Sequence, residues 1–175
     1  MKIAVFIANG SEEIETITPI DILRRANIIV DVVSVTEKTV KCSHGVEIIA
    51  DKVINEINFA DYDGVVIPGG MPGATNISNS KMAIDFIKHL LENNKMVSAI
   101  CASPAVVLAT HNLTNGKNLT CFPAQDFINT IKNSGATYTA KSVEIDGNII
   151  TANGPKSAFE FSMQICAYLG LTPKI

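Results

Sequence analysis

Continuous apolar runs alternate with segments of helical periodicity along the chain. Residues 2–8 and 96–100 contain few polar positions, which is typical of strands covered on both faces. Helical patterns occupy residues 11–25, with Ser11 as the expected N-cap, and residues 82–91, where apolar positions recur at helical spacing. This alternation predicts an α/β fold, a doubly wound and mostly parallel sheet with helices on both faces.

The other segments continue the same pattern. We expect strands at residues 30–35, within "YDGVVIPGG" and at 119–122, a small hairpin from 39–42 and 46–49, a helix at 125–132, a hairpin turning at Asp146-Gly147, and a closing helix at 157–169. With 175 residues, 47% of them hydrophobic, the chain can bury one substantial core. We therefore expect a single domain spanning residues 1–175.

Charge and composition narrow the functional class. The net charge is −3 and no Lys/Arg-rich run is present, which argues against binding of nucleic acid or an anionic membrane. The first apolar run is too short for a signal peptide or a membrane span, so a cytoplasmic location is expected. The four cysteines lack CxxC spacing, which favours free thiols over a metal site or a disulfide framework: Cys42, Cys101, Cys121 and Cys166.

Cys101 stands in "VSAICASPAVVLAT", where a predicted strand gives way to a predicted helix. Functional sites collect at the carboxyl ends of parallel strands, and a helix N-terminus there lowers the pKa of a thiol. Pro104 suits the first helical turn, and the Ala102 N–H is placed to bind a developing oxyanion. We therefore expect Cys101 to be a nucleophile that titrates below its ordinary value. The alternative is a buried cysteine that acts only as a small hydrophobe.

Two further segments are expected at the same sheet edge. Glu15, in "ANGSEEIET", lies one turn into the first helix, where a carboxyl near a thiolate would have a raised pKa and act as general acid and base. The alternative for Glu12, Glu13 or Glu15 is a solvated acid at the helix start. The segment "PGGMPGAT" lacks nucleotide-binding spacings, but Gly69 and Gly70 allow close backbone approach to a ligand. No metal or nucleotide motif is present, so we expect no cofactor.

Four motifs together carry a family resemblance. "GSEEIET", "VIPGG", "AICASP" and "NGPKSAFEF" resemble the ThiJ/PfpI superfamily, and within it the DJ-one/YajL-like branch. The resemblance implies a flavodoxin-like sandwich that forms a homodimer. It also implies that Cys101 is the nucleophile, that Glu15 is a protonated carboxyl hydrogen-bonded to it, and that the N–H groups of Gly70 and Ala102 bind the oxyanion.

The chain departs from this family pattern beside the predicted nucleophile. "LTCFP" places Phe122 where several members carry a histidine, and phenylalanine cannot accept a proton, so a Cys/His dyad and a peptidase activity are disfavoured. Asn153 replaces an arginine of some relatives, and their extra C-terminal helix has no counterpart after Leu169. Cys42 corresponds to the cysteine of the family's small hairpin, near the expected dimer contact. The histidines are expected at the surface or at an interface: His44, His89 and His111.

Three functions fit these residues. The resemblance implies a cofactor-free enzyme of the glyoxalase III or deglycase type, which acts on methylglyoxal, glyoxal or their early adducts with thiols and amines. The second possibility is a redox sensor or stress chaperone that works through oxidation of Cys101. The third is a binding module with an incidental cysteine. Apolar residues on the first helix, Ile14, Ile17 and Ile20, favour a homodimer.

Overall fold

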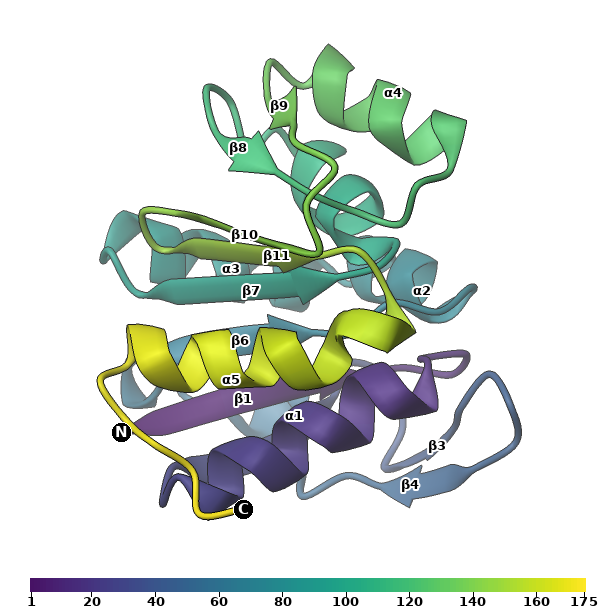
Figure 1. The fold of residues 1–175 in the computed structure, drawn as a ribbon. Coiled ribbons are helices and arrows are strands. Elements are labelled where there is room, and N and C mark those ends of the chain that lie inside the picture. The colour runs from purple at the N-terminus through teal and green to yellow at the C-terminus, as the bar shows by residue number, and fades with distance from the viewer.

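A seven-stranded sheet forms the centre of the computed structural model, which describes residues 1–175 (Figure 1). All neighbouring strands are parallel except the first pair at one edge, which is antiparallel. In spatial order the strands are β10 (Val143–Asp146), β11 (Ile149–Ala152), β7 (Met96–Ile100), β6 (Gly64–Ile67), β1 (Lys2–Ile7), β2 (Ile29–Ser34) and β5 (Lys52–Val53). The predicted doubly wound, mostly parallel sheet is confirmed.

Helices cover both faces of the sheet. Helices α1 (Glu13–Arg25) and α5 (Ala158–Tyr168) lie side by side on one face, and α2 (Gly73–Asn79) and α3 (Lys81–Glu92) lie behind the other (Figure 1). Alternate residues of β1 enter the two layers: Ile3 packs into the core beneath α1 and α5, and Phe6 packs into the core on the opposite face. Burial on both faces therefore explains the continuous apolar run.

Smaller elements flank the sheet. The hairpin of β3 (Thr39–Lys41) and β4 (Glu47–Ile49) lies beyond α1, and a second pair, β8 (Asn118–Leu119) with β9 (Thr137–Tyr138), lies beside α4 (Gln125–Asn133) (Figure 1). The remaining short segments are 3-10 turns at Ile54–Glu56, Phe59–Asp61 and Pro155–Ser157 and a π-helix at Pro104–Ala109. None of the helices combines the length and apolar character needed to cross a membrane.

Two local predictions are wrong. The strand expected at 119–122 ends at Leu119 and pairs outside the main sheet, because the Thr120 N–H donates to the Thr151 side chain instead of a strand neighbour. Ser11 is not the N-cap of α1, since its hydroxyl accepts a hydrogen bond from the Ala8 N–H and Glu12 caps the helix. The pattern also missed β5 and the glycine-rich start of α2, which are too short to show a period.

Candidate active site

Cys101 follows the last residue of β7 in a left-handed backbone conformation, with φ of +65°. Such a conformation costs a non-glycine residue about 1 kcal/mol or more and persists only where the surroundings enforce it. Here the Cys101 N–H donates to the Ala152 carbonyl at 2.9 Å, and the Cys101 carbonyl accepts from the Phe122 N–H at 2.8 Å. Neighbouring chain segments on two sides therefore hold the sharp turn that presents the thiol.

Glu15 reaches the same edge from the first turn of α1 and is fully buried. The N-cap side chain of Glu12 accepts a hydrogen bond from the Glu15 N–H at 2.8 Å, which fixes where the helix begins. Oε2 of Glu15 accepts the Gly69 N–H at 2.8 Å, whereas Oε1 is buried without a hydrogen-bond partner. Burial raises the pKa of Glu15 to about 7, although its interactions with Cys101 and Gly69 oppose the rise.

The glycine pair after β6 lets the loop pass between these side chains. A Cβ atom on Gly69 would lie 2.6 Å from the Cβ of Cys101 and 2.7 Å from Oε2 of Glu15. Gly70 has φ of +84°, and a Cβ there would lie 2.5 Å from the backbone of Glu12. We expected the backbone of both glycines to approach a ligand closely. The Gly69 N–H instead donates to Glu15, whereas the Gly70 N–H interacts with the Cys101 thiol and lowers its pKa.

The expected low pKa of Cys101 is wrong. Burial, followed by the interactions with Glu15, raises the pKa of this thiol to about 12, although the backbone N–H groups of Gly70 and Ala102 act to lower it. A helix N-terminus favours the thiolate, but desolvation disfavours it and has the larger effect here. Because the pKa of Glu15 is about 7 and that of Cys101 is higher, the pair holds about one proton above neutral pH.

Ser103 is a site residue that the sequence reasoning missed. Its buried hydroxyl donates to the Pro68 carbonyl at 2.6 Å, which joins the turn after Cys101 to the loop after β6. In the sequence, Ser103 could have been noticed as a small polar residue inside an otherwise apolar segment. The hydrogen bond positions the glycine pair relative to the thiol without contacting either reactive group.

Glu13 is not the solvated acid considered from the sequence. It is 8% exposed, and its carboxylate accepts hydrogen bonds from the Ser43 hydroxyl at 3.0 Å, from the backbone and ring of His44 and from the Val46 N–H. Burial opposes ionisation, but these donors, His44 foremost, lower the pKa of Glu13 to about 2. Ligand atoms of Glu12, Glu13 and His44 lie within 4.8 Å of one another, yet both Glu13 oxygens already accept hydrogen bonds from the protein.

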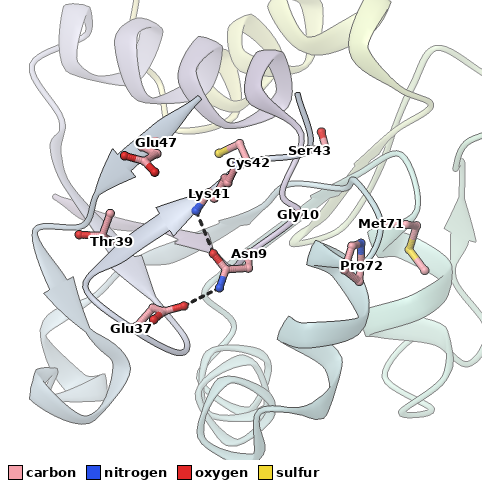
Figure 2. A pocket seen from close by; sticks show the side chains of 10 residues that line it. All are labelled: Asn9, Gly10, Glu37, Thr39, Lys41, Cys42, Ser43, Glu47, Met71 and Pro72. Atoms are coloured by element: carbon pink, nitrogen blue, oxygen red, sulfur yellow. Dashed lines mark hydrogen bonds between the residues drawn. The ribbon is translucent and has the colours of Figure 1, made fainter. Parts of the chain in front are cut away.

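Cys42 is not brought to Cys101. It packs beneath the β3–β4 hairpin, where burial raises its pKa to about 11, and no hydrogen bond links the two residues. Figure 2 shows Cys42 in the wall of a cavity of about 530 Å³ between the hairpin and the loop carrying Met71 and Pro72. The residues that converge are Cys101, Glu15, Gly69, Gly70 and Ala102.

No histidine accompanies the thiol. The His44 ring pairs with Glu13, the His111 ring contacts Ser78, and the His89 ring lies near Phe59. Phe122 is 44% exposed and adjoins Cys101 through its backbone. A thiol and a carboxyl without an imidazole can add to a carbonyl and move a proton, but they lack the usual base of a cysteine peptidase.

The chain is similar to known proteins over most of its length. The chain matches the DJ-1/PfpI family over residues 1–168. It is 36% identical to protein dj-1beta of Drosophila melanogaster over 98% of the chain and 90% of that protein. It is 38% identical to protein DJ-1 homolog B of Arabidopsis thaliana over 94% of the chain, which spans only 37% of that longer protein.

A solved structure has the same fold as this chain. The structure of oxidized DJ-1 from Toxoplasma gondii superposes with a TM-score of 0.90 at 38% identity, over 96% of this chain and 90% of that one. The superposition bears out the flavodoxin-like fold that the motif resemblance implied. With the family match over residues 1–168 and the likeness to the curated relatives, it follows that the chain belongs to the DJ-1/PfpI family.

Proposed function

We propose that this protein is a cysteine-dependent, cofactor-free enzyme of the glyoxalase III or deglycase type. Its substrates are methylglyoxal, glyoxal or their early adducts with thiols and amines. The observation that carries the proposal is the convergence of Cys101 and buried Glu15 on either side of Gly69. Family membership supports the general assignment, and the chemistry of this pair supports the specific reaction.

The first step joins the thiol to the aldehyde. Sγ of Cys101 attacks C1 of methylglyoxal, Glu15 takes the thiol proton, and the aldehyde oxygen acquires the negative charge. The N–H groups of Gly70 and Ala102, which already favour negative charge on sulfur, stabilise this oxyanion. Return of the proton from Glu15 to oxygen gives a hemithioacetal and leaves the carboxylate ionised.

The second step moves hydrogen within the substrate. The Glu15 carboxylate removes the proton from C1, and the resulting enediolate takes that proton back at C2, while the hydroxyl proton on the C1 oxygen passes to the C2 oxygen. C1 is thereby oxidised to a thioester while C2 is reduced to an alcohol, so no external oxidant or reductant is needed. Water then cleaves the S–C bond, releases lactate and restores the Cys101 thiol.

Oxidation of Cys101 is the alternative function. A sulfinate formed at this sulfur would accept hydrogen bonds from the Gly70 N–H and from protonated Glu15, whose Oε1 has no partner in the reduced protein. In that case the protein would be a redox sensor or redox-regulated chaperone. Peroxide-dependent sulfinate formation at Cys101, in a protein without turnover of methylglyoxal, would favour this alternative.

We further propose that the protein works as a cytoplasmic homodimer. Apolar side chains are exposed on α1 and the neighbouring hairpin, with Ile14 52%, Ile17 45% and Ile49 72% exposed. Hydrogen bonds of Glu13 hold the loop of this hairpin against the start of α1. Sedimentation that shows only monomer at micromolar concentration would contradict the dimer.

Lactate formation from methylglyoxal without glutathione tests the enzyme directly. We expect wild-type protein to produce lactate and Cys101→Ser to lose the activity. Cys166→Ser is the matched control, because Cys166 lies on the buried face of α5 and outside the site. Absence of lactate with the wild type, or equal rates for wild type and Cys101→Ser, would overturn the proposed function.

A further inference from the structure

A second cavity lies beside the backbone turn that carries Cys101. It has a volume of about 390 Å³ and is lined by Phe122, Pro123, Asn153, Gly154, Pro155 and Lys156. Two backbone hydrogen bonds connect its walls to Cys101. Phe122 donates to the Cys101 carbonyl, and Asn153 directly follows Ala152, whose carbonyl accepts the Cys101 N–H.

The cavity combines a flat apolar surface with a free cation. The Phe122 ring lies against Gly154, where a Cβ would be 3.4 Å from the ring, and two prolines extend the apolar lining. Lys156 is exposed and takes part in none of the ion pairs or side-chain hydrogen bonds of the protein. The oxygen of Asn153 accepts from the Ser157 hydroxyl at 2.7 Å, which leaves its amide nitrogen as a second donor.

We infer that this cavity is a substrate subsite that selects α-oxoaldehydes whose second carbon carries a planar apolar group ending in a carboxylate. The planar group packs on Phe122, and the carboxylate binds the Lys156 ammonium and the Asn153 amide. Phe122 and Lys156 are therefore specificity-determining residues, although neither takes part in the bond-making steps. This inference rests on the proposed function, because it assigns a substrate class to the same site.

Two contacts in the cavity explain why the larger substrates are preferred. Stacking on an aromatic ring favours the larger substrate by about twofold to tenfold, and pairing with an unengaged, exposed ammonium favours it by about twofold to fivefold. Methylglyoxal carries only a methyl group, which can neither stack on the ring nor pair with the ammonium. Its turnover should therefore depend less on the cavity than the turnover of the larger substrates.

Three substrates separate the contributions: methylglyoxal, phenylglyoxal and 4-carboxyphenylglyoxal. We expect Lys156→Met to lower kcat/KM for 4-carboxyphenylglyoxal about twofold to fivefold and to leave phenylglyoxal and methylglyoxal unchanged. Phe122→Ala, which keeps the backbone N–H that donates to Cys101, should lower kcat/KM for both aromatic substrates by more than it lowers the value for methylglyoxal. Lys132→Met, which changes an equally exposed lysine on α4, is the control. Equal values for wild type and Lys156→Met with 4-carboxyphenylglyoxal would overturn the subsite.

Protection from alkylation tests the subsite without any turnover. Benzoate should slow the reaction of Cys101 with iodoacetamide in the wild type and in Lys132→Met but not in Lys156→Met. Protection of this kind in a protein that forms no lactate would support the subsite and contradict the proposed function. Lactate formation from methylglyoxal without benzoate protection or discrimination among the three substrates would contradict the subsite alone.

Discussion

Replacing Gly69 by alanine places a methyl group between the two reactive side chains. The new Cβ would lie 2.6 Å from the Cβ of Cys101 and 2.7 Å from Oε2 of Glu15, whereas ordinary contacts begin near 3.4 Å. Oε2 of Glu15 and Cβ of Cys101 must therefore each move away from the new methyl group by about 0.7 Å or more. Glu15 is fully buried and the Cβ of Cys101 is attached directly to the backbone, so a simple outward rotation of a surface side chain cannot relieve the clash.

This displacement should affect catalysis more than stability. Overpacking a tightly filled site costs about 1–3 kcal/mol of the free energy of unfolding. A misplacement of about 1 Å at reacting groups costs about 10²-fold in rate. Gly69→Ala should therefore remain folded and lose about 10²-fold in kcat/KM for methylglyoxal.

Gly64→Ala is the matched control at the other end of β6. Its Cβ would lie 2.9 Å from the Met96 carbonyl, so it meets similar crowding away from the site. Urea denaturation and lactate formation should be measured on both variants. We expect comparable destabilisation and a loss of activity confined to Gly69→Ala. Retention of activity within about threefold in Gly69→Ala, or an equal loss in both variants, would refute the reasoning.

Two further predictions follow from burial and charge. Glu13→Gln should lower the free energy of unfolding by about 1–2 kcal/mol at pH 7, after allowance for screening at exposed His44. Because the pKa of Glu13 is about 2 in the folded protein and ordinarily 4.5, this contribution is fully present above pH 4.5 and disappears as the pH falls towards 2. Equal denaturation midpoints for wild type and variant at pH 7 would contradict the prediction. Iodoacetamide should label partly exposed Cys101 in the folded protein and Cys166 only after unfolding, as peptide mapping can show; early labelling of Cys166 would contradict its burial.

The hydrophobic pattern predicted the sheet and its layers because burial on two faces leaves a direct trace in the sequence. In β1, alternate residues enter opposite cores, so the run has no polar face. The same reasoning located Cys101 at the end of β7 and Glu15 in the first turn of α1. Both positions were predicted because side chains that come after parallel strands collect at one edge of the sheet.

The details that control reactivity depend on contacts that no local pattern contains. The left-handed backbone of Cys101 is enforced by Ala152 and Phe122, from strand β11 and from the segment after β8. The pKa of Cys101 depends on how much water the folded chain excludes, which reversed the predicted direction. In the sequence Glu13 resembles a solvated acid, but in the folded chain the hairpin loop supplies hydrogen-bond donors to its carboxylate.

The pH dependence of lactate formation in the Glu15→Gln variant tests the mechanism most directly. Glu15 acts as a base only when ionised and its pKa is about 7, so wild-type kcat/KM should rise with pH, pass through half its maximum near pH 7 and level off about one pH unit higher. Glu15→Gln should lose about 10²–10⁴-fold and show no rise near pH 7, whereas Glu160→Gln, which changes an exposed first-turn acid of α5, should match the wild type. A Glu15→Gln variant with activity within about threefold of the wild type and the same pH profile would contradict the account.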